Sequence, residues 1–87
     1  MNSKIEELMV ITMEECGELI QACSKKIRAS KPPFKSDLAH DLLIEELGDV
    51  QCMMDLIVEN GICSYEDIDQ RAIKKREKLK KWSNLLQ

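Results

Sequence analysis

Glycine, proline and aromatic residues are scarce in this chain. Its 87 residues include three glycines, two prolines and one each of Phe, Tyr and Trp, whereas Leu, Ile, Met, Glu and Lys are frequent. Glycine and proline interrupt helices and the frequent residues favour them, so we expect an all-α protein. The three aromatic residues, Phe34, Tyr65 and Trp82, leave few surfaces on which a nucleobase can stack.

The chain also lacks the features of a membrane-spanning or general nucleic-acid-binding protein. No run approaches the roughly 20 apolar residues that cross a bilayer, and the first residues do not resemble a signal peptide. The formal charge of −3 disfavours binding to a phosphate backbone, although six of the eight residues from Lys74 to Lys81 are basic. We expect a soluble cytoplasmic protein with no nucleic-acid or membrane partner, in which this basic run is mainly a solvated helix face.

The four cysteines form no C-x-x-C pair, and none has zinc-finger spacing to the single histidine, His40. Cysteine packs as a small apolar residue, so free buried thiols are the preferred interpretation of Cys16, Cys23, Cys52 and Cys63. A structural disulfide or a thiolate metal site remains the alternative. We expect His40 to be a surface or capping residue rather than a catalytic one.

Apolar residues recur at helical spacing along most of the chain. We expect a first helix from about Ser3 to Ala29, and then a loop over residues 30–36, because two adjacent prolines stand there. Ser36 or Asp37 can cap a second helical run that begins at Leu38 and continues to about Glu59.

Turn and capping residues mark the boundaries that follow. Asn60-Gly61 is expected to end the second run with a left-handed residue, and Ser64 with Asp67 resembles a capping box that opens a last helix reaching nearly to the C-terminus. The fold predicted for residues 1–87 is a single domain, an antiparallel bundle of three helices, or four if the second run is divided near Asp41. A chain this short buries a limited core, so we expect oligomerisation to complete it.

Two acidic clusters interrupt the apolar pattern, and each contains two carboxylates three residues apart. Glu15 pairs with Glu18, and Glu46 pairs with Asp49; residues at this spacing share one face of a helix. At about 100° per residue, Glu15 and Glu18 fall at the border of the apolar face, whereas Glu46 and Asp49 fall within it. Glu14 lies farther toward solvent.

Ionised carboxylates on an apolar face are costly unless they are paired or bind a metal. No Lys or Arg occurs between Lys35 and Arg71, so neutralisation requires a basic group from another helix, protonation, or a divalent cation. Two facing carboxylate pairs favour Mg²⁺ or Mn²⁺; ordinary surface acids are the alternative. Gly17 and Gly48 lie inside the clusters, where a close helix approach or a ligand would explain a residue that costs up to about 1 kcal/mol in a helix.

The two clusters resemble the signature of MazG-like all-α nucleoside triphosphate pyrophosphohydrolases, E-E-x-x-E followed after a dozen to nearly thirty residues by E-x-x-D. Here the elements are residues 14–18 and 46–49, separated by the 27 residues from Leu19 to Glu45. The flanking segments 20–25 and 75–78 are also similar, so the resemblance covers nearly the whole chain.

The resemblance implies Mg²⁺-dependent hydrolysis of a nucleoside triphosphate between its α- and β-phosphates, with Mn²⁺ as a possible substitute. Relatives form dimers or tetramers, so the resemblance implies a homodimer or a homotetramer. It assigns metal binding to Glu15, Glu18, Glu46 and Asp49. Glu14 matches the leading acid of the motif, which either supports a metal ligand or orients water. Implied phosphate-binding residues are Ser24, Lys25, Lys75 and Lys78.

Two other functions remain open at this point. A phosphoribosyl-ATP pyrophosphohydrolase would use the same acids on a different nucleotide, and a non-enzymatic helical module would use its basic last helix to bind a partner. For Phe34, packing of the loop against the bundle is preferred over stacking on a nucleotide. Trp82 is expected to anchor a core or an interface, and Met9, Met13, Met53 and Met54 are expected to fill the core.

Overall fold

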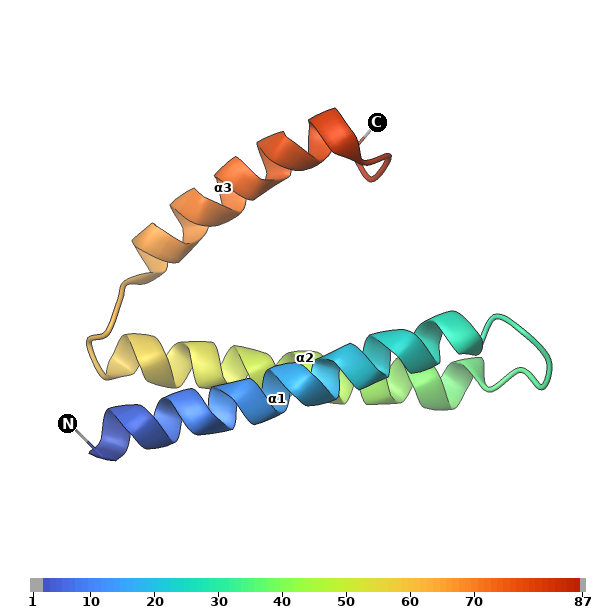
Figure 1. Ribbon diagram of the computed structural model, residues 1–87, viewed down its shortest axis with the longest axis horizontal. Coiled ribbons are helices and arrows are strands. Elements are labelled where there is room, and N and C mark those ends of the chain that lie inside the picture. The colour runs from blue at the N-terminus through green and yellow to red at the C-terminus, as the bar shows by residue number, and fades with distance from the viewer. Residues whose placement is uncertain (1–2, 87) are drawn as a thin grey trace. The chain divides into compact units, whose positions relative to one another are not determined.

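Three α-helices make up the regular structure of the described part of the chain. The computed structural model describes residues 3–86, in which α1 spans Ser3–Arg28, α2 spans Ser36–Glu59 and α3 spans Tyr65–Trp82, with no strand in this range (Figure 1). This confirms the all-α prediction. The second helical run is not divided near Asp41, so α2 is one helix. Positions 1, 2 and 87 of the predicted domain lie outside the described residues.

The end of α2 and the start of α3 follow the local chemistry that predicted them, whereas α2 begins at Ser36, so the predicted caps Ser36 and Asp37 lie within the helix. Gly61 has a left-handed φ of +74°, and its N–H donates to the carbonyl of Val58 at 2.9 Å. This turn ends α2. Ser64 is the N-cap of α3, and its Oγ accepts a hydrogen bond from the N–H of Asp67 at 3.2 Å. The stop at Asn60-Gly61 and the start at Ser64 are therefore confirmed.

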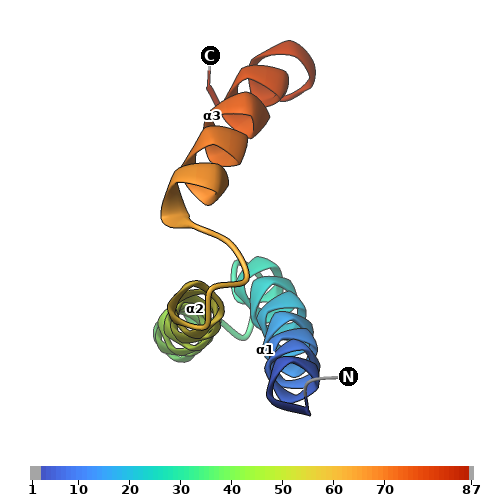
Figure 2. The ribbon, with the colours of Figure 1, turned by 90° about the vertical axis from the view of Figure 1, so that its left-hand side faces the viewer.

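The chain divides into two compact units, Met1–Ile57 and Val58–Gln87. In the first unit, α1 and α2 lie side by side and run in opposite directions, joined by the proline-containing loop (Figures 1 and 2). This pair supplies the antiparallel part of the predicted bundle. The second unit contains α3, and the packing of α3 in a bundle stays a prediction.

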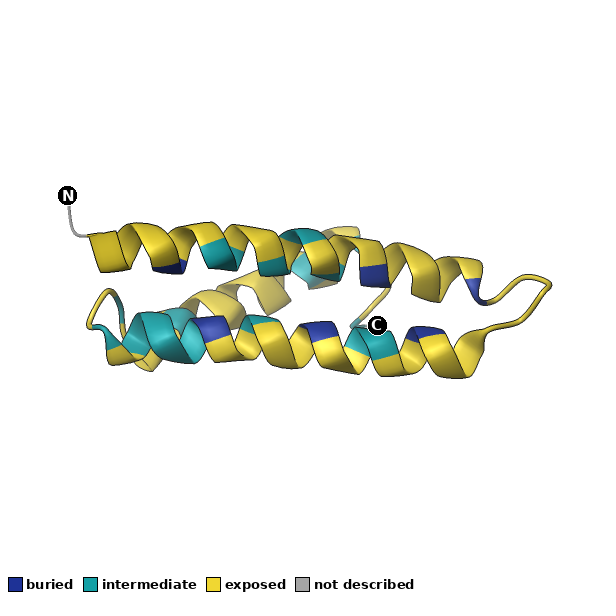
Figure 3. Ribbon diagram, turned by 90° about the horizontal axis from the view of Figure 1, so that it is seen from below, coloured by how far each residue is buried: buried dark blue, intermediate teal, exposed yellow. Residues whose placement is uncertain are grey.

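A narrow stripe of side chains forms the core of the α1–α2 pair. The buried apolar residues are few and mostly small, and Figure 3 shows that the buried positions of α1 and α2 face each other. They are Leu8, Ala22, Ala29, Ala39 and Met53. Many large apolar side chains lie outside this stripe, among them Ile20, which is 71% exposed, and Ile27, which is 70% exposed. Two packed helices touch along a single line. Apolar side chains that lie on the helix surface away from this line therefore stay exposed.

The narrow core overturns several predictions of burial. All four cysteines are free, as expected, but three are exposed and Cys63 is only half-buried, so their predicted burial is wrong. Trp82 is 63% exposed in the second unit, so its role as a core or interface anchor stays a prediction; of the methionines expected to fill the core, Met53 is buried but Met13 is 66% exposed. Phe34 is 68% exposed in the loop, so it does not pack against the helices.

None of the helices within residues 3–86 has the length and apolar character of a membrane span.

Candidate metal centre

Four carboxylates meet across the α1–α2 pair. Glu15 and Glu18 project from α1 and Glu46 and Asp49 from α2, and one oxygen of each lies within 4.8 Å of the others. The three-residue spacing puts each pair on one helical face, and the antiparallel packing brings the two faces together. We call these four residues the acidic cluster. The structure thus brings together the four residues that were predicted from the sequence to be metal ligands. Their role as ligands stays a prediction.

The acidic cluster contains buried oxygens with unused hydrogen-bonding capacity. Glu46 is only 7% exposed and is the one charged residue buried among those described. Its Oε2 and the Oε2 of Glu15 are buried, and neither has a hydrogen-bond partner within the described part of the chain. Buried polar atoms in proteins are almost always paired, so two orphaned oxygens in one site point to a missing positively charged partner.

The pKa values in the acidic cluster also indicate that its ionised form is unfavourable. Burial, together with repulsion from the carboxylates of Glu18, Asp49 and Glu15, raises the pKa of Glu46 to about 6. The pKa of Glu15 is raised from its ordinary value by burial and by the neighbouring charges of Glu18 and Asp49. Every charged group behind these shifts is another acid. The ionised cluster therefore favours binding of a cation.

The donor set matches a hard divalent cation. The cluster offers only carboxylate oxygens, the ligands that Mg²⁺, Mn²⁺ and Ca²⁺ prefer, and it offers no thiolate or imidazole that would select a softer metal. The orphaned oxygens of Glu15 and Glu46 are the atoms such an ion would satisfy. The residues present therefore fit a divalent cation.

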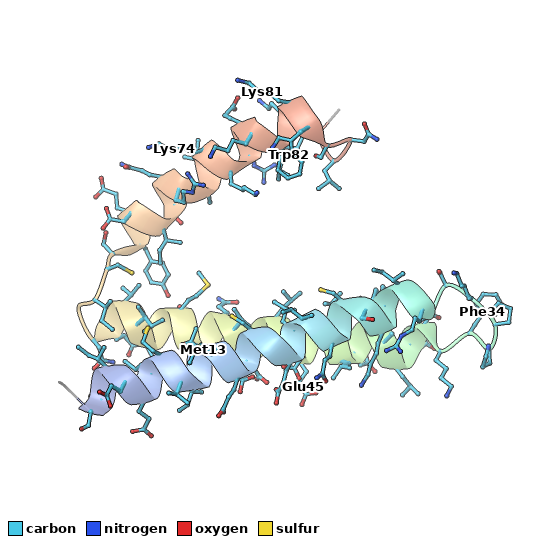
Figure 4. All side chains as sticks on the ribbon, in the orientation of Figure 1. Met13, Phe34, Glu45, Lys74, Lys81 and Trp82 are labelled. Atoms are coloured by element: carbon cyan, nitrogen blue, oxygen red, sulfur yellow. The ribbon has the colours of Figure 1, made fainter. Side chains whose placement is uncertain are left out.

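Neighbouring acids and glycines do not belong to this arrangement. Glu14 and Glu45 are exposed and lie outside the acidic cluster, and Figure 4 labels Glu45. No described heavy atom beyond the local helix backbone lies within 4 Å of a Cβ built on Gly17 or Gly48. Within the α1–α2 pair no helix therefore approaches Gly17 or Gly48 closely, and the alternative explanation of these glycines, a ligand, stays a prediction.

The predicted phosphate-binding residues divide between the two units. Ser24 and Lys25 lie exposed on α1, and Lys25 lines a cavity of about 550 Å³ at the loop end of the α1–α2 pair. Lys75 and Lys78 lie on α3, where the Nζ of Lys75 is 4.8 Å from the ring centroid of Trp82, a cation–π distance. The run from Lys74 to Lys81 is a solvated face apart from the half-buried Leu79 (Figure 4). Phosphate binding by these residues stays a prediction.

Comparison with known families identifies the family of this chain. Residues 3–83 match the family of the MazG nucleotide pyrophosphohydrolase domain. The chain belongs to the MazG family. The match includes the acidic cluster, both helices that carry it and all of α3. Searches of curated proteins and of solved structures found no significant match.

Proposed function

We propose that this chain is a Mg²⁺-dependent nucleoside triphosphate pyrophosphohydrolase, which cleaves an NTP or dNTP between the α- and β-phosphates and gives the monophosphate and pyrophosphate. Membership of the MazG family supports a nucleotide pyrophosphohydrolase. The observation that carries the metal dependence is the acidic cluster, in which four carboxylates converge and two buried oxygens lack partners.

Each helix contributes one half of the proposed metal site. Glu15 and Glu18 supply oxygens from α1, and Glu46 and Asp49 supply them from α2, with Mn²⁺ as a possible substitute for Mg²⁺. A bound Mg²⁺ neutralises phosphate charge and lowers the pKa of a coordinated water. The burial of Glu46 holds its carboxylate in one place, so the substrate meets a preformed site.

The remaining predicted residues act around this site in the proposal. Glu14, exposed and one residue before the cluster, would orient water or support a ligand, and Ser24 with Lys25 would hold phosphate oxygens. Lys75 and Lys78 on α3 would contribute further positive charge. Phosphoryl transfer depends mainly on positioning and charge stabilisation, which these groups supply.

A single domain over residues 1–87 and assembly into a homodimer or homotetramer complete the proposal. Exposed apolar residues support assembly: Ile20, Ile27 and Leu38, each about 70% exposed, lie on the α1–α2 pair, where water contact is unfavourable. Sedimentation of the purified chain would show a mass of two or four copies; a monomer at micromolar concentration would contradict this part.

The activity is tested by a substrate panel in H₂¹⁸O. Each common NTP and dNTP, and phosphoribosyl-ATP, is incubated with the protein and Mg²⁺, and the products are resolved by mass spectrometry. Attack on the α-phosphorus forms a new P–O bond there and breaks the bond to the β-phosphate, so ¹⁸O is expected in the monophosphate and not in pyrophosphate. Release of inorganic phosphate, ¹⁸O in pyrophosphate, or no turnover of any substrate would contradict the proposal.

A further inference from the structure

A basic cavity lies at the loop end of the α1–α2 pair. Its volume is about 550 Å³, and the last turn of α1, the connecting loop and the start of α2 form its wall. Four of its lining residues are cationic: Lys25, Arg28, Lys31 and Lys35. The others are apolar: Ala29, Pro32, Pro33, Leu38, Ala39 and Leu42.

The dipole of α1 does not explain all four cationic residues around this cavity. Cations in the last turn of α1 interact favourably with the helix dipole, which accounts for Lys25 and Arg28. It does not account for Lys31 and Lys35, which lie in the loop beyond the helix end. The acids nearest in sequence, Asp37 and Asp41, do not line the cavity. Four like charges around one cavity, in a chain of net charge −3, are an arrangement that an anion would stabilise.

The cavity lies along the same line of contact between α1 and α2, the α1–α2 seam, as the acidic cluster. Lys25 follows Glu18 by seven residues, which is two turns on the same helical face and about 10 Å along the axis. On the other helix, Leu42 precedes Glu46 by one turn, about 6 Å along the axis. A ligand bound at the acidic cluster therefore has Lys25 about 10 Å away along the helix axis on the loop side, and the other three cations of the cavity lie farther toward the loop.

We propose that this cavity binds the β- and γ-phosphates of the substrate, and then the pyrophosphate product. The substrate lies along the α1–α2 seam with its α-phosphate at the acidic cluster, its pyrophosphate end toward the loop and its nucleoside toward the opposite end of the pair. Arg28 supplies a planar fork of donors that matches phosphate oxygens, and the lysines supply point charges. This inference rests on the proposed function for the identity of the ligand.

Binding of inorganic pyrophosphate tests the cavity without any hydrolysis. Titration calorimetry is carried out on the whole chain in EDTA, so that neither catalysis nor metal binding at the acidic cluster contributes. The double variant Lys31→Ala/Lys35→Ala changes only loop residues, and Arg28→Ala is a second, separate variant. Each is expected to weaken pyrophosphate binding at least tenfold. The matched control is Lys26→Ala, which removes a charge from the same helix end but does not line the cavity and is expected to change affinity less than twofold.

The orientation is tested by a second ligand. Binding of a nucleoside monophosphate in the presence of Mg²⁺ is expected to be the same in wild type and in Lys31→Ala/Lys35→Ala, because the monophosphate lies on the other side of the acidic cluster. Absence of pyrophosphate binding to wild type, equal weakening by Lys26→Ala, or selective loss of monophosphate binding in the loop variant would each overturn the inference. Pyrophosphate binding without turnover of any nucleotide would support the cavity and reject the proposed function, so the two failures are distinguishable.

Discussion

Glu15 on α1 and Glu46 on α2 each hold a buried Oε2 that accepts no hydrogen bond from any described residue. The two oxygens belong to one cluster of four carboxylates, which repel one another when ionised. The α1–α2 pair therefore carries an unfavourable interaction at its centre, and a divalent cation would remove it. Binding of a cation at these two residues would therefore also raise the stability of the folded chain.

The first prediction is that Mg²⁺ raises the thermal stability of the chain. A ligand bound only by the folded state stabilises it by about 2.7 kcal/mol at 100 times its dissociation constant. Differential scanning fluorimetry with Mg²⁺ and with EDTA measures the shift. Glu46→Gln is expected to abolish it, whereas Glu45→Gln, which alters an exposed acid outside the cluster, is expected to retain it. Equal melting temperatures of wild type in Mg²⁺ and EDTA would reject the metal site.

The second prediction concerns activity. Glu46→Gln is expected to lower Mg²⁺-dependent pyrophosphate release by about 100-fold or more, because even groups that only orient metal ligands cost about 10- to 100-fold when removed. The helical circular dichroism spectrum is expected to stay unchanged, since glutamine has the same size. Glu45→Gln is again the control, with activity within twofold of wild type. Full activity in Glu46→Gln would show that this residue is not a ligand.

The third prediction is a pH dependence of the metal-free protein. The pKa of Glu46 is raised from 4.5 to about 6, so between these values the folded chain holds a proton that the unfolded chain has released. The stability that this proton contributes is present at low pH and is lost as the pH rises through 6. Glu46→Gln removes the titration. In EDTA, the melting temperature of this variant relative to wild type is expected to be higher at about pH 7.5 than at about pH 4.5.

Other groups also titrate over this range, so the comparison of variant with wild type carries the test. Glu45→Gln, measured in the same buffers, is expected to show a difference from wild type that does not depend on pH. A Glu46→Gln difference that is equally constant would mean that Glu46 does not hold the raised pKa that its burial indicates.

The fourth prediction uses Gly48, which lies between Glu46 and Asp49 in the sequence. Gly48 is exposed on α2, and a Cβ there meets no described atom within 4 Å beyond the local helix backbone. Gly48→Ala is therefore expected to stabilise the chain by about 0.5–1 kcal/mol through helix propensity, as measured by urea unfolding. Gly61→Ala is the contrasting variant and is expected to destabilise, because φ at Gly61 is +74°. A loss of stability in Gly48→Ala would indicate that another surface covers this position.

Local sequence patterns predicted the helices and the acidic cluster because both depend on short spacings. A three-residue spacing places Glu46 and Asp49 on one face whatever the rest of the chain does, and Ser64 caps α3 through the amide of Asp67, three residues away. The apolar arc around Glu46 predicted its burial, and the structure agrees.

Features that depend on the path of the chain were missed. Arg28, Lys31 and Lys35 surround one cavity because the proline loop turns the chain back on itself, and no spacing rule brings these residues together. The only signal was a run of cations on both sides of the two prolines. Burial of the cysteines was wrongly predicted because the apolar character of a side chain does not reveal how wide a contact its helix makes.

The seven residues between α1 and α2, residues 29–35, have a consequence for how the chain tolerates changes in length. One residue added within α2 before Glu46, with the start of the helix fixed, would rotate Glu46 and Asp49 by about 100° away from α1. The same insertion in the loop leaves the rotation of both helices unchanged and alters the part of the basic cavity that the loop lines. The meeting of the four acids therefore tolerates a change in the length of the loop better than a change in length within α2 before Glu46.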